Sequence, residues 1–164
     1  MKFLTFAMSA LALIGPARAE VVNSSSNGFE ISLSRDSDRD VKTQFDRILR
    51  ISEWWSSDHT WSGDAKHLRI TTLAAGGQWR ETWPNGDVEH GRIIAGNREG
   101  NVWMVRFDSA LGPLQGMGVK GILTMEVEAK DLASSEVRFH YVVTGADFQS
   151  LDEIAPVVDG VLTE

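Results

Sequence analysis

One glutamate lies among aromatic side chains where a proton-transfer group would be useful. In the segment QWRETW, residues 78–83, strand alternation places Glu81 on the same face as Trp79 and Trp83. A carboxyl group held between indoles loses hydration, which raises its pKa and lets it exchange a proton with a bound ligand. The alternatives are an ion pair with a nearby arginine, or a strand end that reaches water.

A histidine occurs in a loop that is unusually rich in tryptophan. His59 follows Trp54 and Trp55 and precedes Trp61. Indoles offer flat contact area and an imidazole offers a hydrogen bond, so this loop is a candidate for the mouth of a cavity. In the competing interpretation, the tryptophans plug one end of the core and His59 bonds a backbone carbonyl.

A second histidine follows directly after a glutamate on one expected strand. Glu89 and His90 are adjacent, so they point to opposite faces and at most one of them faces the interior. If His90 points inward, it meets Glu81 across the hairpin as an acid/base pair. If Glu89 points inward, two carboxylates crowd together. A surface cross-strand pair is the third possibility, and alternation does not decide among them.

Several kinds of chemistry have no support in the sequence. The chain contains no cysteine, which excludes thiol catalysis and thiolate metal ligands. The spacing of His59, Glu81 and His90 matches no zinc pattern, so we expect no metal. No glycine-rich turn opens a helix and no nucleophile elbow is present, so we also expect no cofactor. The net charge of −7 disfavours nucleic acid as a partner.

The start of the chain is typical of an export signal. Lys2 is followed by an apolar run over residues 3–14 and by a small-x-small site at residues 17–19, which predicts cleavage after Ala19. The apolar run is too short to span a bilayer, so we expect a periplasmic or secreted protein without a membrane span. Residues 20–27 are predicted to be a flexible lead-in, and residues 28–164 a single domain.

The elements that would position these side chains form an α+β pattern. A strand at residues 29–33 leads into a helix that begins near Ser37, and a short helix follows at residues 51–55. Six further strands separated by turn signals bring the expected total to seven. Short connections between successive strands require antiparallel pairing. These further strands are expected at residues 68–73, 78–83, 88–95, 102–108, 119–128 and 137–144.

The last segment has the pattern of an amphipathic helix. Ser150 and Glu153 form a capping-box pattern, and six apolar residues between 151 and 162 share one face. The apolar stripe is still running at Glu164, which predicts that the natural helix is longer.

The order strand, helices, six-stranded meander and C-terminal helix resembles the helix-grip fold of the START-like or SRPBCC superfamily. The strings WWSSDHTWSGDA (54–65), GGQWRETWPNGDVEHG (76–91), LGPLQGMGVKGILT (111–124) and VVTGADFQSLDEIAPVVDGVL (142–162) resemble its bacterial polyketide cyclase/dehydrase-like branch. This resemblance implies a seven-stranded curved sheet around the C-terminal helix, with a cavity for an apolar molecule. The expected ligand-binding residues are Trp55, His59, Trp61, Trp79, Glu81, Trp83, Trp103, Phe107, Gln115, Leu123, Met125, Phe139, Tyr141, Ile154 and Val158.

Three functions remain open at this point. The first is an exported binding protein for a small hydrophobic or aromatic ligand, and it is favoured because no catalytic signature is present. The second is a cyclase, dehydratase or isomerase that uses Glu81 as acid/base with His59 or His90 polarising a carbonyl. The third is an interaction module that pairs through the C-terminal helix. The expected assembly is a monomer or a weak homodimer.

Overall fold

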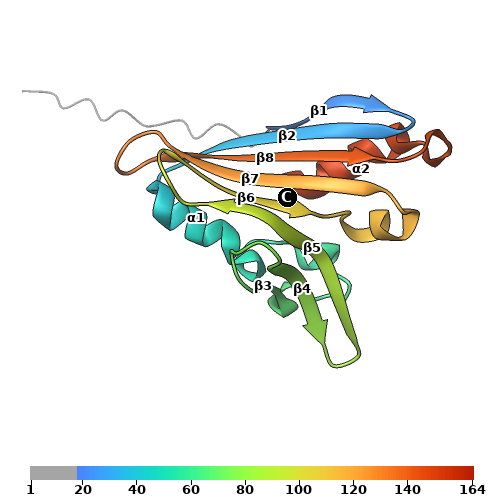
Figure 1. Cartoon of the computed structure of the whole chain (residues 1–164), viewed down its shortest axis with the longest axis horizontal. Coiled ribbons are helices and arrows are strands. Elements are labelled where there is room, and N and C mark those ends of the chain that lie inside the picture. Colours follow the sequence, from blue (N-terminus) through green and yellow to red (C-terminus); the bar gives the residue numbers. More distant parts are fainter. Residues whose placement is uncertain (1–17) are drawn as a thin grey trace, which may run out of the picture.

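The computed structural model describes residues 18–164 as one curved antiparallel sheet with two α-helices (Figure 1). The predicted export signal falls almost entirely outside these residues. The sheet has eight strands in the order β1-β2-β8-β7-β6-β5-β4-β3. The strands are β1 (Arg18–Ser25), β2 (Gly28–Ser37), β3 (Leu68–Ile70), β4 (Gln78–Trp83), β5 (Gly86–Asn97), β6 (Val102–Asp108), β7 (Lys120–Ala129) and β8 (Ser135–Thr144); the helices are α1 (Val41–Leu49) and α2 (Leu151–Thr163).

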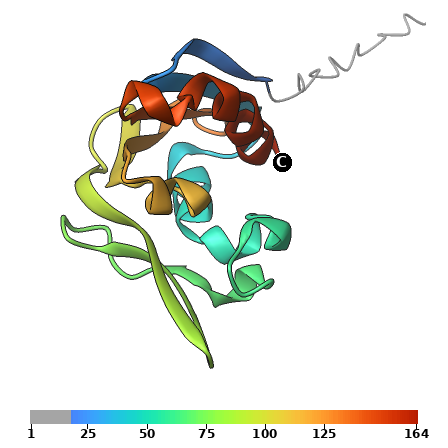
Figure 2. The same cartoon turned by 90° about the vertical axis from the view of Figure 1, so that its right-hand side faces the viewer.

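Every neighbouring pair of strands is antiparallel, as the short connections predict. β3 to β8 follow one another as a meander, and β2 then pairs with β8, the last strand of the chain. Register shifts interrupt three of the pairings, at Val21/Asn23, Trp79/Arg80 and Ile93/Ala95. Such irregularities bend strands and increase their twist, which suits a sheet that must wrap around helices. Figure 2 shows the sheet curving around the helices.

The main difference from the predicted fold is the strand β1. Residues 20–27 were expected to be flexible, but Glu20 to Ser25 belong to a strand that pairs with β2 from Ala19↔Leu33 to Ser25↔Gly28. No sequence pattern predicts this strand, because β1 is an edge strand and its Ser/Asn-rich segment carries no apolar alternation. The sheet therefore has eight strands instead of seven.

The N-terminal caps of the two helices differ from the expected ones. α1 is capped by Asp40, whose carboxylate accepts a hydrogen bond from the Thr43 backbone N–H at 2.9 Å, whereas Ser37 still belongs to β2. α2 follows Ser150, which has a positive φ of 49° and makes no side-chain cap, so the predicted capping box does not form. The short helix expected at residues 51–55 is the 3₁₀ segment η1 (Ile51–Glu53).

The core lies on the concave side of the sheet, and alternation predicted it correctly. Along β7 and β8, the buried residues Leu123, Met125, Phe139 and Tyr141 lie on one face, opposite the charged side chains. α1 adds Phe45, whose ring packs edge-on against Trp103. No helix within residues 18–164 is long and apolar enough to cross a membrane.

Candidate functional site

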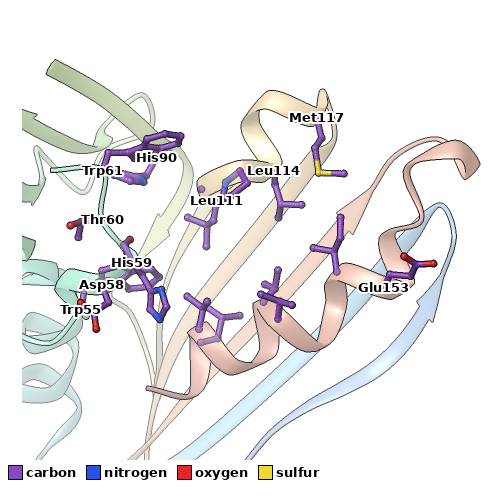
Figure 3. A pocket seen from close by; sticks show the side chains of 17 residues that line it. Trp55, Asp58, His59, Thr60, Trp61, His90, Leu111, Leu114, Met117 and Glu153 are labelled. Atoms are coloured by element: carbon purple, nitrogen blue, oxygen red, sulfur yellow. Dashed lines mark hydrogen bonds between the residues drawn. The ribbon is translucent and has the colours of Figure 1, made fainter. Parts of the chain in front are cut away.

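A cavity of about 620 Å³ lies between α2, the segment before β7, and the tryptophan-rich loop (Figure 3). Its wall is mostly apolar, and its polar side chains come from the loop, from β5 and from the start of α2. This volume falls within the range of ordinary small-molecule sites. The lining residues are Trp55, Asp58, His59, Thr60, Trp61, His90, Leu111, Gly112, Pro113, Leu114, Met117, Glu153, Ile154, Val157, Val158, Val161 and Leu162.

Helix α2 supplies one wall because its apolar residues extend over two faces. Leu151 and Ala155 are fully buried, and the helix packs on β1 and β2. Ile154, Val158 and Val161 lie one helical step away and face the cavity. The stripe that marked α2 as amphipathic is therefore wider than the core alone requires.

The opposite wall is the 3₁₀ segment η4 (Gly112–Met117), which a buried tyrosine anchors to the sheet. The Tyr141 hydroxyl donates to the Ser109 carbonyl at 3.0 Å and accepts from the Leu111 N–H at 3.0 Å. Burial raises the pKa of Tyr141, so the hydroxyl keeps its proton. Gly121 makes this approach possible, because a Cβ there would lie 2.1 Å from the Ser109 carbonyl oxygen.

The tryptophan-rich loop is held by its own indoles. Trp55 Nε1 donates to the His59 carbonyl at 3.1 Å, and Trp54 Nε1 donates to the Ile48 carbonyl at 3.1 Å. His59 Nε2 lies 2.9 Å from a carboxylate oxygen of Glu164. Trp61 is 55% exposed and still lines the cavity, so this loop forms part of its rim.

Glu81 holds this loop in place rather than facing the cavity. Its carboxylate accepts from the backbone N–H groups of Trp61 at 3.1 Å and Ser62 at 2.5 Å, and it lies 2.9 Å from His90 Nε2. The side chain is completely buried and does not line the cavity. Both oxygens are occupied by groups of the protein itself, so none is directed at a ligand.

The pKa of Glu81 is displaced in the opposite direction to the one expected. Burial raises the pKa, but hydrogen bonds from Ser62, Trp61 and His90 outweigh burial and hold it below the ordinary 4.5. Glu81 is therefore a carboxylate at neutral pH. Sequence patterns identify a desolvated position, but they do not reveal the backbone donors that a distant loop brings to it.

The structure places His90 inward and Glu89 outward, which decides the question that alternation left open. His90 is 5% exposed and lines the cavity, and its ring lies 5.6 Å from that of Trp79. Glu89 bonds Gln78 and Arg92 on the other face. Burial lowers the pKa of His90 below 6.5 despite the opposing effect of Glu81, so the imidazole is neutral at pH 7.

These displaced pKa values predict a loss of stability in mild acid. A histidine with a lowered folded pKa contributes its full stabilisation above the unfolded value, 6.5, and loses it as the pH falls through the folded pKa. We expect thermal midpoints to decrease between pH 7 and 5, and His90→Gln to flatten this part of the profile. Glu81 adds a further loss below about pH 4.5. A wild-type midpoint that is constant from pH 7 to 5 would contradict this prediction.

Only some of the expected binding residues meet at the cavity. Those that line it are Trp55, His59, Trp61, Ile154 and Val158, and the candidate acid/base residue His90 lines it with them. The others lie elsewhere in the fold because the concave face is mostly filled by its own side chains. Trp79, Glu81, Phe107, Leu123, Met125 and Tyr141 are buried in the core; Trp103 packs on Phe45; Gln115 donates to the Glu89 carbonyl; Trp83 lies near the β4–β5 turn; and Phe139 borders a smaller cavity of about 180 Å³.

The lining residues that were not expected come from η4 with Leu111 before it, from α2, and from the tryptophan-rich loop. Leu111, Leu114 and Met117 contact the cavity from the segment between β6 and β7, where no helix or strand was expected. Val157 and Val161 were signalled by the helical spacing of α2 but not singled out. Within the described part of the chain, no cluster of three or more His, Cys, Asp or Glu side chains has the arrangement of a metal site.

Comparisons with known proteins show the fold. No protein-family model and no curated protein matches this sequence. A conserved protein of unknown function from Enterococcus faecalis superposes with a TM-score of 0.53 and 12% identity, over 90% of this chain and 72% of that one. Human STARD10 gives 0.51 and 12%, over 98% and 71% of the chains. The human StarD13 lipid transfer and protein localization domain gives 0.53 and 8%, over 98% and 87%.

These likenesses confirm the predicted START-like helix-grip fold. At such low identities they do not bear on the polyketide cyclase branch, which stays a prediction.

Proposed function

From a START-like helix-grip fold with an apolar cavity, we propose that the protein binds a small hydrophobic or aromatic molecule between α2, η4 and the tryptophan-rich loop. The cavity itself is the observation that carries this proposal. A soluble domain rarely keeps apolar surface around about 620 Å³ of space unless a ligand or partner covers it. The lipid transfer domain of StarD13, which has the same fold, supports this class of ligand.

Partly filling the cavity should weaken binding without unfolding the protein. Val158 is partly exposed on the cavity wall of α2, so Val158→Trp extends an indole into the space. We expect the Kd of the neutral probe N-phenyl-1-naphthylamine, measured by fluorescence, to rise at least tenfold. Val22→Trp is the matched control, because Val22 is 49% exposed on β1 and lines neither cavity.

Equal affinities in wild type and Val158→Trp would contradict this site. Native mass spectrometry of the purified protein then identifies the natural ligand class through any molecule that copurifies. That molecule also tests the enzyme alternative, because incubation with the protein either leaves its mass and isomer composition unchanged or converts it.

The enzyme alternative is supported by one observation. His90 lines the cavity and is oriented by a carboxylate, an arrangement that also serves general bases. In that case His90, rather than Glu81, contacts the substrate. Conversion that disappears in His90→Gln while binding persists would establish this function in place of simple binding.

We further propose that the protein is exported. The supporting pattern is the charged start, apolar run and small-residue site in residues 1–19. Expression of the whole chain in a bacterial host should yield a periplasmic or secreted product, and its intact mass should be that of a chain that starts at Glu20. A product of full-length mass in the cytoplasm would contradict export.

A further inference from the structure

His90 differs from every other polar side chain that lines the cavity. Asp58 and Glu153 are exposed, and His59 and Thr60 are partly exposed, so water can serve all four. His90, by contrast, is 5% exposed and lies on β5. A group that forms a hydrogen bond with the His90 ring must therefore reach it through the cavity, whose wall is mostly apolar.

The contact with Glu81 determines which nitrogen of His90 carries the proton. Glu81 already accepts the N–H groups of Trp61 and Ser62, and as a carboxylate it has no proton to give. The 2.9 Å contact must therefore be a donation from His90 Nε2–H to Glu81. In the neutral ring, Nδ1 is then an acceptor. The carboxylate behind Nε2 also makes Nδ1 a stronger acceptor, since the two nitrogens share one π-system.

This acceptor has no partner within residues 18–164. No hydrogen bond to Nδ1 occurs among the described residues, whereas Nε2 is paired. In that part of the chain, three buried side-chain atoms have no hydrogen-bond partner and no contact with solvent. They are Trp79 Nε1, Thr82 Oγ1 and Asp159 Oδ1. Nδ1 is not one of them, so it remains accessible, and the surface that His90 exposes is the cavity wall. The imidazole ring of His90 packs on the indole of Trp79, with 5.6 Å between the ring centroids.

We propose that the cavity selects a hydroxyl-bearing aromatic ligand, whose O–H donates to His90 Nδ1 while its ring contacts the apolar wall. This inference rests on the proposed binding function and specifies its ligand class. A neutral O–H supplies the donor that Nδ1 lacks among the described residues of the protein. A carboxylate has no proton to offer and would approach the charge of Glu81.

Matched ligands test this selection in the wild-type protein. Calorimetric titration with 1-naphthol, 1-methoxynaphthalene and naphthalene compares the same ring system with and without a donor. We expect 1-naphthol to bind at least tenfold more tightly than the other two. Binding of all three with equal affinity would overturn the hydroxyl inference but leave the apolar site intact. Failure of all three to bind would instead overturn the proposed function.

A variant then assigns the preference to one side chain. His90→Phe keeps an aromatic ring beside Trp79 but removes Nδ1, so the preference for 1-naphthol should fall to about threefold or less. His140→Phe is the control, because His140 pairs with Glu30 on the outer face of β8 and lines neither cavity. A preference that survives in His90→Phe would overturn the proposal.

Nitrogen NMR of histidine-labelled wild-type protein decides the question even if His90→Phe fails to fold. The free protein should show His90 protonated on Nε2 only. 1-Naphthol should shift the Nδ1 resonance in the direction of hydrogen bonding, and 1-methoxynaphthalene should not. Protonation on Nδ1, or an unchanged Nδ1 resonance with bound 1-naphthol, would overturn the proposal.

Discussion

Replacing Glu81 with glutamine is expected to lower the free energy of unfolding by about 3–5 kcal/mol, the range seen when one partner of a buried charged network is removed. The carboxylate accepts from two backbone N–H groups and from His90, and it is completely buried. An amide has one acceptor oxygen, and its NH₂ group would face a donor. At least one buried N–H therefore loses its partner.

Glu89→Gln is the control for this experiment. Glu89 lies on the neighbouring strand and also bonds other side chains, but it faces solvent, where an ion pair contributes about 1 kcal/mol or less. Denaturant unfolding of both variants gives the comparison directly. A Glu81→Gln cost no larger than that of Glu89→Gln would show that Glu81 does not hold the loop.

Amide hydrogen exchange locates the effect. In wild type the N–H groups of Trp61 and Ser62 should be protected, because Glu81 accepts both of them. In Glu81→Gln their exchange should accelerate more than that of the β7 and β8 amides. Because Trp61 lines the cavity, the same change should also weaken ligand binding.

The prediction of Glu81 shows how far sequence patterns extend. Alternation on β4 correctly placed Trp79 and Glu81 on the buried face, because the period of a strand depends only on local geometry. The expected raised pKa was wrong, because its value depends on N–H groups from a loop about twenty residues earlier in the chain. That loop has no periodicity, so nothing in the sequence indicates which of its amides reach the carboxylate.

The fold was predictable for a related reason. The strands from β4 to β8 alternate or are bounded by turn residues, and their expected bounds agree with the structure to within about two residues, whereas β2 continues to Ser37, beyond its expected end at residue 33. β1 was missed because its Ser/Asn-rich segment carries no apolar alternation, although the strand pairs with β2 and α2 packs on it. The cavity wall from η4 was missed because a 3₁₀ segment containing glycines has no period that distinguishes an inward from an outward side chain.

The site itself was predicted by residue type more than by position. His90 and the tryptophan-rich loop do meet at the cavity, but the concave face of the sheet is largely filled by Phe107, Leu123 and Met125. Sequence alone gives the face on which a side chain lies, whereas the unfilled volume depends on where α2 and η4 rest above that face. Trp61 and Trp79 show this most clearly. Both were expected to bind the ligand, but Trp61 lines the cavity and Trp79 is buried in the core.

Trp79→Ala should lower the free energy of unfolding by about 3–5 kcal/mol, whereas Trp61→Ala should change it by about 0.5 kcal/mol or less. Trp79 is completely buried, and its ring packs against Trp55, Phe107 and His90 at 5.0, 5.9 and 5.6 Å. Its truncation leaves a void that these rings cannot fill. Trp79→Phe should cost less, because it keeps a ring and removes an indole N–H that has no partner among residues 18–164.

Ligand binding should respond in the reverse order. Trp61 is 55% exposed at the rim, so its truncation removes contact area from the ligand while leaving the core unchanged. We expect Trp61→Ala to weaken N-phenyl-1-naphthylamine binding several-fold at a temperature where Trp61→Ala and Trp79→Phe are both folded, and Trp79→Phe to weaken it less. Denaturant unfolding and probe titration on the same samples separate the two effects. If Trp61→Ala destabilises the fold while leaving the probe affinity unchanged, then Trp61 belongs to the core and the rim of the cavity lies elsewhere.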